Sequence, residues 1–114
     1  MTGGFVEEPA HVVAPQEVVR VLSALSDVNR YRIVGLLANG CTELTCGAIC
    51  TALQLSPSLV SHHLSVLEEA GLLDRRKNGL WTLNRLRRDE LARRLSGLQE
   101  MARINPLNGD STQN

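Results

Sequence analysis

The hydrophobic period of this chain changes twice, and this restricts the folds that it can adopt. Up to about residue 69, apolar side chains recur every three or four residues, which is typical of amphipathic helices. The period then becomes two, in Leu73–Lys77 and Leu80–Leu83, on either side of Asn78-Gly79, a preferred pair for a tight type I′ hairpin turn. Helical spacing returns from about Asp89 to Arg103. The sequence therefore predicts a mainly α protein with one β-hairpin.

Four helices are expected before the hairpin, and capping residues set their limits. The first expected helix is Gln16–Leu25, and the second is capped by Asp27 and ends at Gly40. The apolar stripe of the second helix consists of Tyr31, Val34, Leu37 and Ala38. The third helix is capped by Thr45 and ends at Leu53, and the fourth is capped by Ser56, starts at Pro57 and ends at Glu69. The order α-α-α-α-β-β-α is that of a winged helix-turn-helix, an α+β fold.

The length of 114 residues allows one compact domain. We expect it over residues 15–104, between disordered polar tails at 1–14 and 105–114. No apolar run approaches the roughly 20 residues of a membrane span, and the first residues lack a basic signal-peptide start. The sequence therefore predicts a cytoplasmic protein without a membrane partner, whose three cysteines are reduced.

Charge is distributed unevenly along a chain whose formal net charge is zero. Residues 75–94 carry eight basic and two acidic side chains, whereas residues 1–74 carry three basic and eight acidic ones. A basic block at and after a hairpin can attract a polyanion, although it is also compatible with an ordinary solvated surface.

The expected fourth helix has the pattern of a DNA-reading helix. Val60, Leu64 and Leu67 fall on one side and should face the core. Small polar residues fall on the opposite side, and their hydroxyl and imidazole groups can bond base edges or phosphates; they are Ser58, Ser61, His62 and Ser65. The hairpin adds Arg75, Arg76 and Lys77, which we expect to contact backbone phosphates and so to supply affinity more than specificity. Together these features predict binding of double-stranded DNA.

The same residues resemble a known family. The stretches ALSDVNRYRIVGLLANG and LTCGAICTALQLSPSLVSHHLSVLEEAGLLDRRKNGLWTL are similar to the arsenic-repressor (ArsR/SmtB) family, over about residues 17–103. The resemblance implies a homodimer, paired through the first and last helices, that represses a two-fold symmetric operator and releases it when an inducer binds. It also implies that Ser58, Ser61, His62 and Ser65 face the DNA and that Arg75 to Lys77 begin the wing.

Apolar residues beyond the needs of one small core support a dimer independently. The last helix carries a stripe that a short domain has limited core to absorb, and the first helix has apolar positions to spare. The predicted interface residues are Val18, Leu22, Leu91, Leu95 and Leu98.

Three cysteines within ten residues suggest where an inducer acts. Cys46 and Cys50 are four residues apart on the expected third helix, and Cys41 lies in the loop before it. Three thiolates suit a thiophilic ion in trigonal geometry, such as arsenite, antimonite, cadmium or lead, acting as inducer and not needed for folding. The pattern departs from the family's Cys-Val-Cys motif, and Cys50 occupies a position where the fold usually keeps a small buried alanine.

An alternative inducer is an oxidant or a reactive sulfur species, because two nearby thiols can form a disulfide. Cys46 also lies near a helix N-terminus, which would favour its thiolate form. A third reading makes Cys50 core filler. His11 is either a solvated side chain or a ligand given to the other subunit. The last helix has no histidine, which argues against the family's zinc site there. No catalytic motif is evident, so we do not expect an enzyme. We also do not expect a module that binds only proteins.

Overall fold

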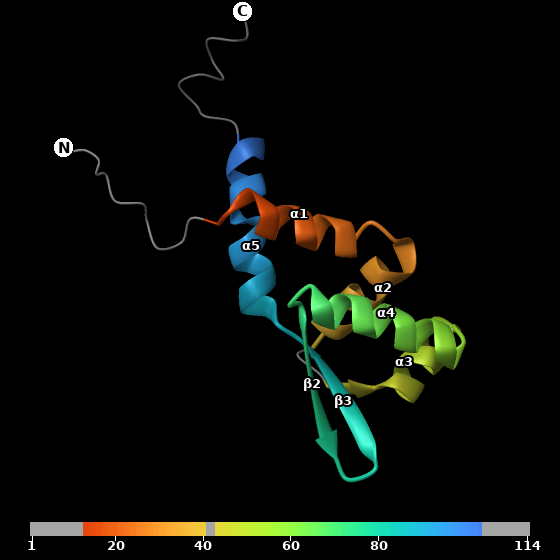
Figure 1. Ribbon diagram of the computed structural model, residues 1–114. Coiled ribbons are helices and arrows are strands. Elements are labelled where there is room, and N and C mark those ends of the chain that lie inside the picture. Colours follow the sequence, from red (N-terminus) through yellow and green to blue (C-terminus); the bar gives the residue numbers. More distant parts are fainter. Residues whose placement is uncertain (1–12, 41–42, 104–114) are drawn as a thin grey trace, which may run out of the picture.

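The structure, a computed structural model, describes residues 13–40 and 43–103 (Figure 1). The elements in chain order are α1 (Pro15–Ala24), α2 (Val28–Ala38), β1 (Leu44–Thr45), α3 (Cys46–Leu53), α4 (Pro57–Glu69), β2 (Leu73–Asn78), β3 (Trp81–Leu86) and α5 (Arg88–Ala102). Helix α4 and the hairpin β2–β3 have the placement of a recognition helix and its wing. The predicted winged helix-turn-helix is therefore confirmed. Residues 1–12 and 104–114, which make up nearly all of the predicted tails, lie outside the described residues, as does Cys41.

Local capping explains where the central helices begin. The Asp27 carboxylate accepts hydrogen bonds from the backbone N–H groups of Asn29 (2.8 Å) and Arg30 (3.2 Å). Thr45 caps α3 through the N–H of Ala48, and Ser56 caps α4 through that of Leu59. These side chains satisfy N–H groups that a helix leaves unpaired in its first turn. All three predicted caps are confirmed.

The core lies where α2, α3, α4 and the root of the hairpin meet. Its fully buried apolar side chains include Ile33, Leu37, Ile49, Val60, Leu64, Leu67 and Leu72. Val60, Leu64 and Leu67 therefore occupy the inner side of α4, as predicted. Tyr31, which we grouped with the apolar stripe of α2, is 64% exposed. Val34 and Leu37 of that stripe are buried as predicted, and Ile33 completes the inner face of α2 in place of Tyr31.

The hairpin turn differs from the predicted one. Asn78 pairs with Trp81, so the two-residue turn is Gly79-Leu80 rather than Asn78-Gly79. Gly79 has φ +68° and Leu80 does not have a positive φ, which fits a type II′ turn with glycine first and not a type I′ turn. The cross-strand partner of Lys77 becomes Thr82 instead of Leu80. A shift of two residues leaves each side chain on its predicted face of the sheet.

A third strand, which the sequence did not indicate, anchors the wing to the body. The two-residue strand β1 pairs antiparallel with β3, giving the sheet order β1-β3-β2. Asn84 on β3 is fully buried at this junction. Its side chain donates to the carbonyl oxygen of Leu44 (3.0 Å) and accepts from Nε of Arg75 (2.8 Å). Both ends of the buried amide are thus satisfied, which ties the chain just before α3 to the wing.

Helix α5 is joined to the rest of the domain by ion pairs. Arg93 pairs with Glu17 of α1 (2.8 Å) and with Glu90 of its own helix (3.0 Å). Arg94 pairs with Glu90 (2.9 Å) and donates to the carbonyl oxygen of Ala70, directly after α4 (2.7 Å). Hydrogen bonds from Arg93 and Arg94 lower the pKa of Glu90 to about 2. The helix predicted to pair two subunits is therefore held against the end of the helix predicted to read DNA.

A buried histidine links α4 to α2. His63 is only 4% exposed, and its ring lies 3.2 Å from a guanidinium nitrogen of Arg30 and 3.7 Å from the Asp27 carboxylate. Burial lowers the pKa of His63, and the neighbouring Arg30 and His62 lower it further, while Asp27 raises it. The folded state consequently holds a neutral imidazole at this site. His63 therefore packs inside the fold and is not part of the outer face of α4.

Acidification should therefore destabilise the fold through His63. The unfolded histidine takes up a proton near pH 6.5, whereas the folded one does so only at a lower pH. Below about pH 6.5 the unfolded state binds more protons, so the free energy of unfolding should fall until the folded pKa is reached. Thermal melts between about pH 7.5 and pH 5.5 measure this slope. His63→Gln should flatten it and His62→Gln, on the exposed side of α4, should not; equal slopes in the two variants would contradict the assignment.

Candidate nucleic-acid interface and thiol pair

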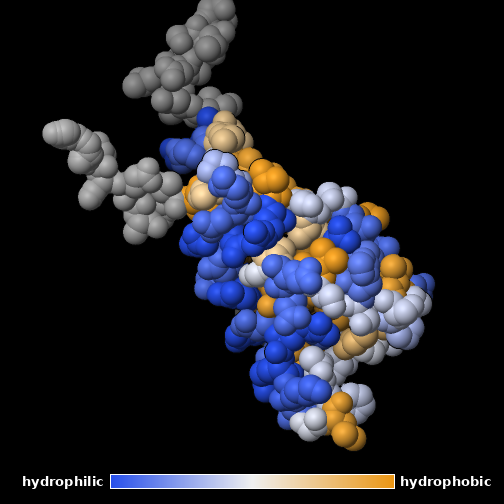
Figure 2. Space-filling model, in the orientation of Figure 1, coloured by the Kyte–Doolittle hydropathy of each residue, from blue (hydrophilic) through white to orange (hydrophobic). Residues whose placement is uncertain are grey.

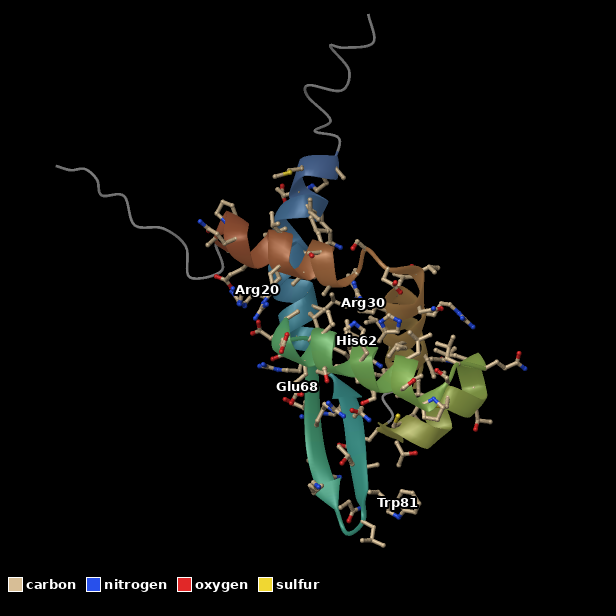
Figure 3. The ribbon with its side chains drawn as sticks, turned by 45° about the vertical axis from the view of Figure 1, so that its right-hand side comes forward. Arg20, Arg30, His62, Glu68 and Trp81 are labelled. Atoms are coloured by element: carbon tan, nitrogen blue, oxygen red, sulfur yellow. The ribbon has the colours of Figure 1, made fainter. Side chains whose placement is uncertain are left out.

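The outer face of α4 is small, polar and open to solvent. All four predicted DNA-facing residues are exposed: Ser58, Ser61, His62 and Ser65. Figure 3 shows His62 on this helix, above the wing. Ser56 caps the helix and Pro57 is its first residue, so the backbone N–H groups of the first turn lie at the same end of the helix as Ser58. Hydroxyls, an imidazole and a helix N-terminus together suit contact with base edges and phosphates.

The tight turn before α4 depends on an unusual backbone conformation. Gln54 has φ +58° and ψ +48°, the left-handed region, which is uncommon for a residue with a side chain. The N–H of Leu55 bonds the carbonyl oxygen of Cys50 (3.1 Å) and closes the end of α3. This turn directs the chain from α3 into α4 within three residues. It produces the helix-turn-helix pair that the sequence predicted.

The predicted wing cations are less free than expected. Arg75 is bound to Asn84 and lies 3.3 Å from the Glu68 carboxylate, with 22% of its side chain exposed. Arg76 donates two hydrogen bonds to Glu43, at 2.7 and 3.0 Å. Lys77 is exposed and forms no ion pair within the described part of the chain. Two of the three predicted phosphate contacts are therefore occupied by internal partners in this structure.

Cys46 and Cys50 lie together on α3, each partly exposed and partly packed against the core. Burial raises the pKa of the Cys46 thiol, and its interaction with Cys50 raises it further, against a smaller lowering by Arg75. We expected the helix N-terminus to favour the Cys46 thiolate, and that expectation is wrong because burial and the second thiol outweigh it. Within residues 13–40 and 43–103, no group of three His, Cys, Asp or Glu side chains is placed to hold a metal ion.

The predicted dimer residues divide into two groups. Leu91 and Leu95 pack partly against the core of the same chain. Val18, Leu22 and Leu98 instead line an apolar groove of about 560 Å³ between α1 and α5. Val19 (60% exposed) and Met101 (82% exposed) extend the same groove. Met101 continues the apolar stripe of the last helix that the sequence indicated, whereas the sequence did not single out Val19.

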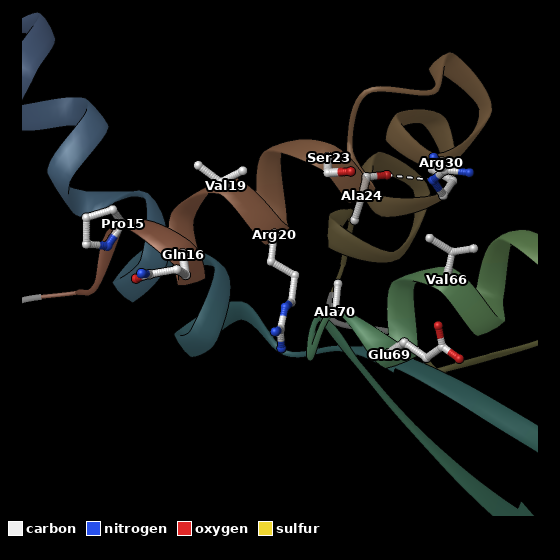
Figure 4. A pocket seen from close by; sticks show the side chains of 10 residues that line it. All are labelled: Pro15, Gln16, Val19, Arg20, Ser23, Ala24, Arg30, Val66, Glu69 and Ala70. Carbon is white, nitrogen blue, oxygen red and sulfur yellow. Dashed lines mark hydrogen bonds between the residues drawn. The ribbon is translucent and has the colours of Figure 1, made fainter.

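A second groove, of about 720 Å³, lies between α1 and the end of α4 (Figure 4). Arg20 and Glu69 stand at its rim. Arg30, at its inner end, donates from Nε to the carbonyl oxygen of Ala24 (2.6 Å) and so holds the end of α1. None of the ten residues that line this groove is a cysteine or a histidine.

Known proteins match most of this arrangement. Residues 27–75 match the family described as bacterial regulatory protein, arsR family. The structure is similar to the homodimeric winged helix-turn-helix DNA-binding domain of a possible ArsR-family regulator from Mycobacterium bovis, with 32% identity, a TM-score of 0.63, and coverage of 76% of this chain and 79% of that one. The chain belongs to the ArsR family. Members of this family are DNA-binding transcription regulators and not enzymes.

Two further known proteins are similar to the chain. An arsenical resistance operon repressor from Escherichia coli is 41% identical over 68 residues, which are 60% of this chain and 57% of that repressor. The chain thus spans little more than half of that relative's length. A structure described as reduced HlyU from Vibrio cholerae is 26% identical, with a TM-score of 0.60, and the match covers 78% of this chain and 92% of that one.

Among the described residues, no helix is both long and apolar enough to cross a bilayer.

Proposed function

We propose that this ArsR-family chain is a cytoplasmic homodimeric repressor, which binds operator DNA through α4 of each subunit and releases it when an inducer acts on its cysteines. The observation that carries the DNA-binding part is the exposed face of Ser58, Ser61, His62 and Ser65 beside the helix N-terminus. Small side chains let the helix approach the bases closely, and the family's role and the homodimeric relative support a symmetric complex.

The proposed inducer is a thiophilic ion of the arsenite class. Burial and the neighbouring Cys50 raise the pKa of the Cys46 thiol, so this thiol is protonated at neutral pH. Arsenous acid reacts readily with protonated thiols: each As–S bond that forms replaces an As–O bond, and the thiol proton leaves with the displaced oxygen as water. Cys46 and Cys50 would supply two sulfur ligands, and the third is assigned to Cys41, outside the described residues. The resemblance to an arsenical resistance repressor supports this choice.

Thiol oxidation is the second candidate. The contact between Cys46 and Cys50 favours it, because a peroxide can take two electrons and two protons from the two thiols. The products are a disulfide and either two waters, from hydrogen peroxide, or one water and one alcohol, from an alkyl hydroperoxide. A relative solved in a form described as reduced is consistent with such chemistry. The raised pKa of Cys46 works against it, since the thiolate is the species that attacks an oxidant.

The experiment measures the affinity for a duplex selected from a random pool, at two salt concentrations and with each inducer. Binding to phosphates should weaken steeply with salt. Arsenite should release the duplex, and Cys46→Ser should bind it as well as wild type but lose the release. Cys50→Ala should abolish release if Cys50 is a ligand of the inducer. The same substitution should leave release intact if Cys50 only fills the core. Zinc, peroxide and a persulfide donor complete the panel.

The pH dependence of release distinguishes the ions. Cadmium must displace a proton from each thiol, so its potency should rise steeply between about pH 6 and pH 8. Arsenous acid loses water instead of a proton, so its potency should change little over that range. Release by peroxide alone would favour the redox alternative. Normal release from all three single cysteine variants would place the sensor elsewhere.

A further inference from the structure

The far end of the wing is apolar and uncovered. Leu80 is 97% exposed and Trp81, the only tryptophan of the chain, is 63% exposed. Figure 3 places Trp81 at the end of the hairpin, and Figure 2 shows a hydrophobic end below the hydrophilic side chains of the wing strands. Two adjacent large apolar side chains at the extremity of a domain lose contact with water only when a partner covers them. We call Leu80 and Trp81 the wing tip.

The charges around the wing tip favour a polyanion as that partner. The sequence has no acidic residue from Arg75 to Arg88. The arginines of the strands are engaged internally, Arg76 with Glu43 and Arg85 with Asp74 at 2.6 Å. The exposed Lys77, near the tip, forms no ion pair within residues 13–40 and 43–103. The end of the wing can therefore approach phosphates without carboxylate repulsion, with a cation beside an apolar edge.

The length of the hairpin suits the groove next to α4. Strands β2 and β3 have six residues each, which corresponds to a reach of about 20 Å. The root of the wing is fixed beside the end of α4 by the pair of Arg75 and Glu68. With α4 in a major groove, the neighbouring minor groove lies about half a helical turn away, or about 17 Å. That groove is about 6 Å wide, which admits the end of a two-residue turn but no helix.

We propose that the wing tip is an apolar wedge, in which Leu80 and Trp81 enter the minor groove of duplex DNA beside the major groove read by α4. This inference rests on the proposed DNA binding and adds a determinant of specificity to it. A wedge partly unstacks the base step that it contacts. Pyrimidine–purine steps such as TA open most easily, so the wing tip should make affinity depend on the flanking sequence.

The test uses the selected duplex in two forms, with either TA steps or runs of G·C pairs flanking the core sequence. Wild type should bind the TA-flanked form about tenfold more tightly. Leu80→Ser and Trp81→Ser should each reduce this ratio to about twofold or less and leave binding to the G·C-flanked form largely intact. Val28→Ser, at a valine of α2 that is 69% exposed, is the matched control and should keep the full ratio.

Trp81 also reports its own environment, because no other tryptophan contributes to the emission. Stacking on a base should quench its fluorescence when the TA-flanked duplex saturates the protein. An unchanged emission, or an unchanged ratio in the two wing variants, would overturn the wedge. If the Trp81 emission shifts with protein concentration in the absence of DNA, the wing tip lies between copies of the chain. That result would also overturn the wedge. A wild-type chain that binds no duplex would refute the proposed function itself, whereas binding with a silent Trp81 refutes only the wedge.

Discussion

Replacing Ser61 with glutamate should abolish duplex binding and leave the fold intact. Ser61 is exposed in the middle of the polar face of α4, next to His62 and one turn before Ser65. A carboxylate there would enter a groove lined by phosphates, where repulsion and lost hydration oppose binding together. We expect at least about a hundredfold loss of affinity, because like charges placed across an interface cost several kcal/mol.

Two controls separate the site from a general charge effect. Ser61→Ala removes only the hydroxyl and should weaken binding by about fivefold, the low end of the range for a lost base contact. Gln99→Glu adds the same negative charge at an exposed position of α5 and should change binding only slightly. Equal losses for the two glutamate variants would show that net charge decides the affinity, and the assignment of α4 as the reading helix would fail. Circular dichroism of each variant checks that the fold is retained.

Short-range signals explain why much of this fold could be predicted. Asp27, Thr45 and Ser56 start their helices through hydrogen bonds that span two or three residues, so the neighbouring sequence contains all the information needed. The apolar side of α4 follows in the same way from a spacing of three and four residues. The exposed polar face of α4 could then be predicted, because it is the remaining side of the same helix.

The features that escaped prediction depend on contacts between distant residues. Strand β1 is two residues long and has no period of its own, and it exists because Leu44 and Thr45 meet β3 about 40 residues later. The position of the hairpin turn depends on that same sheet, since both possible turns contain Gly79. The internal pairing of the wing arginines and the direction of the Cys46 pKa shift likewise follow from tertiary burial, which the local sequence does not contain.

Replacing Leu22 with glutamate should convert the proposed dimer to monomers. Leu22 is 41% exposed in the apolar groove between α1 and α5, so the change removes little from the core of its own chain. Leu95 would be a poorer choice, because it packs partly against that core and a charge there would also affect folding. In a symmetric interface each substitution acts twice, and it buries two carboxylates in an apolar contact.

The consequence for DNA binding follows from geometry. A dimer presents two α4 helices about one helical turn of DNA apart, about 34–36 Å, so both half-sites are bound in one event. A monomer loses that gain, and we expect about a hundredfold weaker binding to a duplex with two half-sites, but unchanged binding to one half-site. Val28→Glu, on the exposed start of α2, is the matched control and should remain dimeric. Sedimentation equilibrium and titration of the two duplexes measure both effects. If Leu22→Glu sediments as a dimer, the subunits pair through another surface, and the groove between α1 and α5 must be assigned a different occupant.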